Sequence, residues 1–152
     1  MMKVVIKFFR PLLIVMMQSW WFITRPKTYG AQVIVRCDDK ILLVKTTYGY
    51  AYSLPGGGIK KNEAPDEAAK RETFEEVGIV LDKLLPLPSF ITYKEYKEDT
   101  VYPFYSTVTS LDFKLDALEI DLAEWHPITK LPKLGTVTQK SIDLYLTQLQ
   151  NK

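Results

Sequence analysis

The chain has 152 residues, of which 47% are hydrophobic and 25% are charged. These values are typical of a globular protein and exclude an intrinsically disordered chain, which combines low hydrophobicity with high net charge. Because domains of about 100 to 150 residues are the commonest, we expect one compact domain. The 20 basic and 18 acidic residues give a net charge of +2, which excludes general charge-driven binding to nucleic acid.

The single cysteine and the single histidine exclude two further classes of site. A structural zinc site needs about four Cys or His ligands, and one cysteine cannot form a disulfide within the chain. Cys37 follows an apolar run, so we expect a half-buried packing residue rather than a catalytic thiol. His126 lies between Trp125 and Pro127 and is a poor candidate for a Ser-His-Asp triad. A lone thiol is compatible with a reducing compartment, and we expect a cytoplasmic location.

Residues 1–27 differ from the rest of the chain in composition. They contain five basic residues and no acidic residue, among apolar and aromatic side chains that include Trp20 and Trp21. The longest stretch without a charge, Pro11 to Thr24, has 14 residues, fewer than the roughly 20 that a membrane-spanning helix needs. A cleaved signal peptide is not expected, because no small-residue cleavage site follows the apolar core. We expect this segment to pack on the domain or on a partner subunit, as in a homodimer, with peripheral contact to a membrane surface as the alternative.

Residues 28–150 carry the pattern of the folded domain, which we expect to begin with a β-hairpin. Short runs of apolar and β-branched residues at Ala31 to Arg36 and at Lys40 to Thr46 have the length of strands. Asp38 and Asp39 lie between the two runs, and such residues are typical of a tight turn. The first two strands are therefore predicted to be antiparallel neighbours.

A second hairpin is predicted after the middle of the chain. The segments Ser89 to Lys97 and Val101 to Leu111 are rich in Tyr, Phe, Val and Thr, which favour strands. The charged pair Glu98 and Asp99 lies between the two segments. We therefore place the turn of this hairpin at the charged pair.

Two helices are predicted, one in the middle of the chain and one near its end. Good helix formers occupy Ala64 to Val77, with Pro65 suited to the first helical position and Gly78 to the left-handed residue after the last turn. Apolar residues recur at helical spacing from Thr136 to Leu149. The order of strands, loop, helix, strands and helix predicts an α/β or α+β fold with a mixed sheet.

Three glutamates of the central helix break the rules of local helix stability together. Glu72, Glu75 and Glu76 stand at positions i, i+3 and i+4, which places their carboxylates on one face. They repel one another, and they lie near the C-terminal end of the helix, where the macrodipole disfavours negative charge. Such a violation is expected where a bound cation compensates for it. Carboxylate oxygens favour Mg²⁺, with Mn²⁺ as a substitute, and Mg²⁺ recruits the phosphate oxygens of a substrate.

The glutamates alone leave a solvated acidic face, balanced by Lys70 and Arg71, as an alternative. Their neighbours favour the metal site, because the whole set resembles the signature of the Nudix hydrolases. That signature is a Gly, five residues, a Glu, seven residues and then R-E-U-x-E-E-x-G-U, where U is an aliphatic residue. The matching residues are Gly57, Glu63, Arg71, Glu72, Glu75, Glu76, Gly78 and Ile79. Thr73 departs from the pattern at an aliphatic position, and this departure concerns local packing.

The resemblance implies the Nudix fold, a mixed β-sheet sandwiched between α-helices. In that family the residues that match Glu72, Glu75 and Glu76 bind the metal, and the residue that matches Arg71 orients a carboxylate through its planar guanidinium. Glu63 is expected to assist from the entrance of the helix. The implied reaction is Mg²⁺-dependent attack of an activated water on a phosphorus atom, and we expect Glu72, Glu76 and Arg71 to be catalytic.

Family members often bring a further acidic ligand or base from a later loop. In this chain the segment Glu119 to Trp125 would supply it, and Glu119 is our first choice, ahead of Glu124 and Asp121. A surface charge is the alternative for each of these residues. Glu119 would be both a metal ligand and catalytic, and Glu76 and Glu119 are the two candidates for the general base.

Substrate contacts are expected at the glycine run, at Glu63 and at two aromatic residues. Glycine lets the chain pass close to the helix. We therefore expect the backbone amides of Gly56, Gly57 and Gly58 to lie open towards a diphosphate. Tyr52 and Trp125 are interpreted as one side of a pocket that stacks on a base, and core packing is the alternative for both.

The resemblance implies a small-molecule substrate, namely a nucleoside diphosphate linked to another group X, as in a nucleoside triphosphate, a dinucleoside polyphosphate or a nucleotide sugar. Tyr93 and Tyr96 lie roughly where diadenosine polyphosphate hydrolases of the family carry a tyrosine, although aromatic strands also supply tyrosines for packing. Two other functions remain as alternatives. One is a catalytically silent domain that binds a nucleotide and regulates a partner, and the other is a membrane-surface hydrolase of a lipid-linked or isoprenoid diphosphate.

Overall fold

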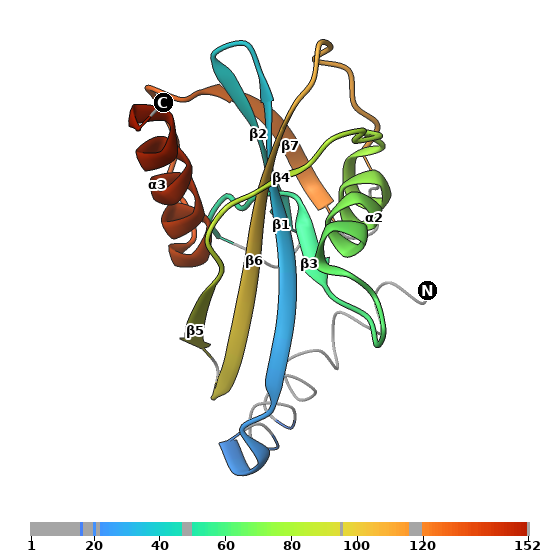
Figure 1. Cartoon of the computed structure of the whole chain (residues 1–152), viewed down its shortest axis with the longest axis vertical. Helices are drawn as coiled ribbons and strands as arrows, with labels where there is room; N and C mark the ends of the chain where they lie inside the picture. The colour runs from blue at the N-terminus through green and yellow to red at the C-terminus, as the bar shows by residue number, and fades with distance from the viewer. Residues whose placement is uncertain are drawn as a thin grey trace.

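A mixed β-sheet with a helix on each face is built by the residues that this computed structural model describes (Figure 1). These are Met16, Trp20 and residues 22–46, 50–94, 96–115 and 120–151. No helix within these ranges is long and apolar enough to cross a membrane. The described elements run from Lys27 to Gln150, and the predicted domain comprised residues 28–150.

Seven strands of the described chain form the sheet, in the order β4-β6-β1-β2-β7, with β3 paired to β1 and β5 paired to β6. Their bounds are β1 Lys27–Cys37, β2 Lys40–Thr46, β3 Gly56–Gly58, β4 Leu85–Pro86, β5 Phe90–Lys94, β6 Lys97–Thr107 and β7 Ile120–Pro127. Strands β1 and β6 are parallel, whereas the other named pairs are antiparallel. The predicted fold class with a mixed sheet is therefore confirmed.

The first predicted hairpin is present, but the turn of the second one was misplaced. In the first, Cys37 pairs with Lys40 across the turn. In the second, β5 and β6 pair from Phe90↔Val101 to Lys94↔Lys97, so Glu98 and Asp99 lie inside β6 and not at the turn. The two charged residues are accommodated there because their partners come from a strand that is distant in sequence. Lys27 on β1 forms an ion pair with Glu98 at 3.2 Å, and the neighbouring Thr28 hydroxyl donates to Asp99 at 2.6 Å.

Side chains of successive strand residues point to opposite faces of the sheet, and this alternation divides the core into two layers. Val33 and Val35 of β1 pack in a cluster with the buried residues of helix α2, Pro65–Val77. Ile34, which lies between them, packs in a second cluster with buried residues of helix α3, Thr136–Gln150. The two helices consequently cover opposite faces of the sheet, as Figure 1 shows.

Helix α2 begins and ends as the sequence predicts. Pro65 is its first residue, and Gly78 follows its last turn with φ 66°, donating its N–H to the carbonyl of Phe74 at 2.9 Å. Thr73 is fully buried, and its hydroxyl donates to the carbonyl of Ala69 at 2.8 Å. The departure from an aliphatic residue at this position therefore leaves no unsatisfied polar group in the core.

Two smaller expectations concern packing. Cys37 was expected to be half-buried, and its side chain is buried almost completely, with 4% of the residue exposed. Of residues 1–27, the described part includes Phe22, whose ring contacts the ring of Tyr96 edge-on with centroids 5.0 Å apart. Trp20 is 66% exposed. The remaining placement of this segment lies outside the described residues.

We predict that Gly56→Ala destabilises the fold strongly, because Gly56 has φ 152° and an added Cβ would lie 2.2 Å from the carbonyl oxygen of Ala31. The free energy of unfolding in urea should fall by at least about 2 kcal/mol. Gly58→Ala is the matched control, since a Cβ there meets nothing within 4 Å. Its expected change is less than about 1 kcal/mol. Equal losses in the two variants would contradict this account of the glycine run.

Candidate active site

Acidic side chains of helix α2 pack against strand β3, which consists of three glycines. The carboxylate of Glu72 lies so close to Gly57 that an added Cβ there would be 2.5 Å from its Cδ. Glu76 is buried, and its Oε2 accepts a hydrogen bond from the backbone N–H of Gly56 at 2.9 Å. Two of the three predicted metal-binding glutamates on α2 are therefore held against the glycine run.

Arg71 is the centre of the charged cluster. Its Nε and Nη2 donate to the two oxygens of Glu63 at 2.7 and 2.9 Å, which is the two-pronged geometry that a guanidinium favours with a carboxylate. Its Nη1 donates to Glu72 at 2.5 Å and to Glu75 at 3.1 Å, and Nη2 also donates to the carbonyl oxygen of Gly58 at 3.0 Å. One guanidinium thus links three carboxylates and the end of the glycine run.

This pairing shifts the protonation of both partners. Hydrogen bonds from Arg71, and then from the backbone N–H of Lys60, lower the pKa of Glu63 from 4.5 to about 2. The hydrogen bond to Glu63 raises the pKa of Arg71 above its already high usual value. Both groups are consequently charged throughout the physiological pH range.

The donor set on α2 suits a hard divalent cation. Glu72, Glu75 and Glu76 offer carboxylate oxygens, which are the ligands that Mg²⁺ prefers, and the side chain of Glu75 is 52% exposed. Among the residues that the structure describes, no three His, Cys, Asp or Glu side chains stand close enough together to hold a metal ion as they lie. Glu72 and Glu75 accept hydrogen bonds from Arg71, and Glu76 accepts one from the backbone N–H of Gly56. Arg71 therefore supplies the positive charge opposite Glu72 and Glu75.

Tyr52 and Trp125, which the sequence suggested for one pocket, lie on opposite faces of the sheet. Strand β7 pairs with β2, and Trp125 packs with the cluster on the α2 side, where its Nε1 donates to the carbonyl of Leu111 at 2.8 Å. Tyr52 packs with the cluster on the α3 side, and its hydroxyl donates to Glu124. This hydrogen bond, with burial as the second cause, raises the pKa of Tyr52. The geometry supports the core-packing alternative for both aromatic residues.

The later acidic residues are not brought to α2 within the described chain. Glu124 is engaged by Tyr52 on the α3 side, and Asp121 is exposed on β7. Glu119 lies outside the described residues. Tyr93 and Tyr96 are 77% and 56% exposed, so the structure gives neither a site of its own.

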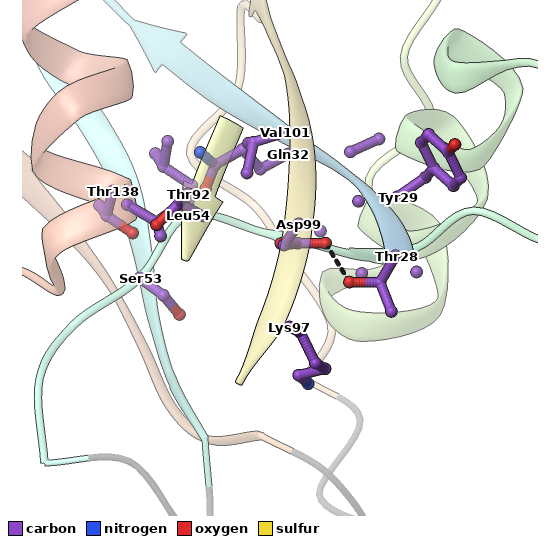
Figure 2. Close-up of a pocket in the computed structure, with 16 residues that line it drawn as sticks. Thr28, Tyr29, Gln32, Ser53, Leu54, Thr92, Lys97, Asp99, Val101 and Thr138 are labelled. Atoms are coloured by element: carbon purple, nitrogen blue, oxygen red, sulfur yellow. Dashed lines mark hydrogen bonds between the residues drawn. The ribbon is translucent and has the colours of Figure 1, made fainter. Parts of the chain in front are cut away.

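A pocket of about 460 Å³ opens beside the glycine run, and sequence reasoning missed most of its lining (Figure 2). Its walls come from β1, β3, β5, β6 and α3, and include Thr28, Gln32 and Asp99. The Gln32 side-chain amide donates to the hydroxyl of Ser141 and so ties β1 to α3. No local motif marks these residues, because the parallel pairing of β1 with β6 brings Thr28 and Asp99 together across 71 positions. Only knowledge of that pairing could have identified them.

Comparison with known proteins identifies the family to which this site belongs. A family model described as NUDIX domain matches residues 26–146, which include α2, the glycine run and the pocket-lining strands. The chain belongs to the Nudix family. Nudix hydrolases generally use divalent metal ions, which agrees with the donor set on α2.

Two Nudix relatives of this chain are named for different substrates, a diphosphoinositol polyphosphate and a nucleotide. Diphosphoinositol polyphosphate phosphohydrolase 3-alpha of Mus musculus is 39% identical over 75 residues, which are 49% of this chain and 45% of that protein. A Bacillus subtilis (strain 168) protein that is provisionally described as an 8-oxo-dGTP diphosphatase is 31% identical over 106 residues, 69% of this chain and 70% of that protein. The chain therefore spans less than half the length of the diphosphoinositol relative.

Solved structures show the same Nudix fold. A MutT NUDIX hydrolase from Burkholderia pseudomallei superposes with a TM-score of 0.72 at 21% identity, covering 78% of this chain and 97% of that one. A MutT protein from Methanosarcina mazei Go1 gives a TM-score of 0.72 at 19% identity, covering 85% of this chain and 99% of that one. The fold implied by the sequence signature is thereby confirmed.

We predict that Glu63→Gln removes a pH-dependent part of the stability. The folded-state pKa of Glu63 lies below its ordinary value, so its contribution is fully present above pH 4.5 and is lost as the pH falls towards about 2. The difference in urea midpoint between wild type and variant should be constant from neutral pH down to the ordinary carboxyl pKa and should then shrink. A difference that stays constant across the acidic range would rule out this pairing.

Proposed function

We propose that this protein is a Nudix pyrophosphohydrolase that cleaves the phosphoanhydride bond of a nucleoside diphosphate linked to another group, with Mg²⁺ as cofactor and Mn²⁺ as a substitute. The observation that carries the proposal is the contact of α2 with β3. Glu72 lies against Gly57 and Glu76 against Gly56, so a set of carboxylates meets a backbone that a diphosphate can approach closely.

Glu72, Glu75 and Glu76 would hold the metal, and Glu119 stays our proposal for a further ligand from the later part of the chain. When bound, the divalent cation supplies activation of the attacking water and neutralises the charge that develops on the leaving phosphate. The fit rests on the chemistry of the donors, because oxygen-only ligands of this kind select hard cations.

The chain's own residues position the reacting groups. Arg71 holds Glu72 and Glu75 through one nitrogen while its other two nitrogens grip Glu63, so the carboxylates are oriented before a substrate binds. Gly57 excludes any side chain from the space beside Glu72. Glu76 and Glu119 remain our two candidates for the group that accepts the proton of the attacking water.

The charge of the pocket favours a nucleoside over a polyphosphorylated inositol. Among the 16 described residues that line it, the charged side chains are Asp99 and Lys97, one of each sign. A ring that bears several phosphates needs several cations around it, whereas a nucleoside is neutral apart from its phosphates. The relative with a nucleotide in its name also shares the larger part of its length with this chain.

The two alternatives have less support. A catalytically silent domain would have little reason to retain the strained set of glutamates, and the Arg71 contacts keep that set organised. A membrane-surface enzyme would depend on residues 1–27, most of which lie outside the described chain. We place the enzyme in the cytoplasm and take a small-molecule nucleotide as its partner.

We predict that Glu75→Gln and Glu76→Gln each lower kcat by at least about 100-fold, because each removes a charged ligand of the proposed metal. Hydrolysis would be measured by chromatographic separation of the products, with Mg²⁺, on nucleoside triphosphates, nucleotide sugars, dinucleoside polyphosphates and a diphosphoinositol polyphosphate. Asp66→Asn is the matched control, since it removes an exposed carboxylate from the first turn of the same helix. Full activity in both glutamine variants, with an unchanged circular dichroism spectrum, would refute the mechanism.

Chelation gives a second, independent test of the proposed cofactor. EDTA should abolish hydrolysis, and added Mg²⁺ should restore it, with Mn²⁺ able to substitute, because both ions accept carboxylate and phosphate oxygens. Thermal unfolding with and without EDTA is the control for loss of structure. Undiminished turnover in EDTA would count against a divalent metal.

A further inference from the structure

Helical residues just before β1 leave large apolar side chains exposed. Met16, Trp20 and Ile23 are helical, and they are 61%, 66% and 77% exposed. The Thr24 hydroxyl donates to the carbonyl of Trp20 at 2.8 Å, a contact between residues four apart that is typical of a helix. Met16 precedes Trp20 by four residues and Ile23 follows it by three, which is the spacing of one helical face. We call these three side chains the apolar face.

The opposite side of the same helical residues is attached to the domain. Phe22 is two residues from Trp20, so its side chain lies on another side of the helix. Its ring contacts the ring of Tyr96 edge-on, with centroids 5.0 Å apart. Tyr96 lies between β5 and β6, and Figure 1 shows the helical residues at the same end of the molecule as that hairpin. The contact of Phe22 with the domain consequently leaves the apolar face directed away from it.

The charge around the apolar face indicates what would cover it. Residues 1–27 carry five basic residues and no acidic one, whereas residues 28–152 carry 15 basic and 18 acidic residues. Arg25 and Lys27 directly follow the apolar face and are both exposed. Lys27 keeps 70% of its side chain exposed although it pairs with Glu98. A negatively charged surface would therefore attract this end of the chain and repel the remainder, which favours a single orientation.

A lipid surface fits the apolar face better than a second copy of the chain does. Two copies that met through this face would bring two basic segments together, and their like charges would repel. Tryptophan is enriched at the level of lipid headgroups, and a helix with one apolar face and basic residues lies in the plane of the membrane interface. The longest run without a charge in residues 1–27 has 14 residues, which is too short to span a bilayer.

We propose that the apolar face of Met16, Trp20 and Ile23 docks the chain on an anionic lipid surface, where Arg25 and Lys27 contact the headgroups. The docking is peripheral and reversible. It concerns where the enzyme binds and not what it cleaves, so the substrate stays the soluble nucleotide proposed above. The inference does not depend on hydrolysis.

Flotation of the full chain with lipid vesicles, at increasing lipid concentration, would measure the partition coefficient. Wild type should bind phosphatidylcholine vesicles that contain phosphatidylserine at least about tenfold more strongly than pure phosphatidylcholine vesicles, and added salt should remove most of this difference. Trp20→Ser combined with Ile23→Ser should lower binding at least about tenfold, because two apolar side chains no longer enter the interface. Arg25→Gln should lower binding about fivefold on the anionic vesicles alone.

Val80→Ser is the matched control, because Val80 is also apolar and 71% exposed but lies beyond the last residue of α2. It should bind vesicles as wild type does. The Trp20→Ser, Ile23→Ser double variant should keep the wild-type thermal midpoint, since both side chains are exposed in the fold. Its hydrolysis of a soluble nucleotide in the absence of lipid should also be unchanged.

Several results would overturn the docking proposal. They are a wild type that does not float with anionic vesicles, equal binding to both kinds of vesicle, or full binding by the double variant. Sedimentation velocity covers the remaining occupant, because a dimer that is lost in the double variant, without vesicle binding, would make the apolar face an interface between two copies. Glu76→Gln should lose hydrolysis and keep vesicle binding, so failure of the docking proposal and failure of the proposed function are distinguishable.

Discussion

The guanidinium of Arg71 is the contact on which the rest of the site depends. Glu72, Glu75 and Glu76 would repel one another on a bare helix, and the helix dipole opposes them as well. Arg71 meets two of them through one nitrogen and uses the others for Glu63 and the last glycine of the run. The hydrogen bonds of Arg71 thereby orient carboxylates that would otherwise repel one another. The same side chain also binds Gly58 and Glu63 in the segment before α2.

The glycine run is the second half of this arrangement. Gly56 and Gly57 have no space for a Cβ, the first because of β1 and the second because of Glu72. Strand β3 therefore lies in close contact with both β1 and α2, and this close approach fixes the helix on its face of the sheet. The same strand also lines the pocket, whose other walls include residues of α3, the helix on the face of the sheet opposite α2.

Features encoded by neighbouring residues could be predicted from the sequence, and features that depend on distant pairing could not. Helix α2, its proline start and its glycine end are set by local propensity, and the signature that identifies the family lies largely within it. The turn of the second hairpin was misplaced because Glu98 and Asp99 look like turn residues until their partners on β1 are known. Trp125 and Tyr52 were grouped because both are aromatic, whereas Trp125 on β7 packs in the cluster beside α2 and Tyr52, which lies between β2 and β3, packs in the cluster beside α3.

The parallel pairing of β1 with β6 also has a consequence for how the protein acquires its activity. The contact of Thr28 with Asp99 closes a loop of 71 positions, and contacts of such long range are slow to form in folding. Helix α2 lies inside that loop and is built from local contacts, so it can form early, before the two strands meet. The acidic helix would then form before the pocket, because the pocket is lined by both β1 and β6 and is complete only when these two strands have paired.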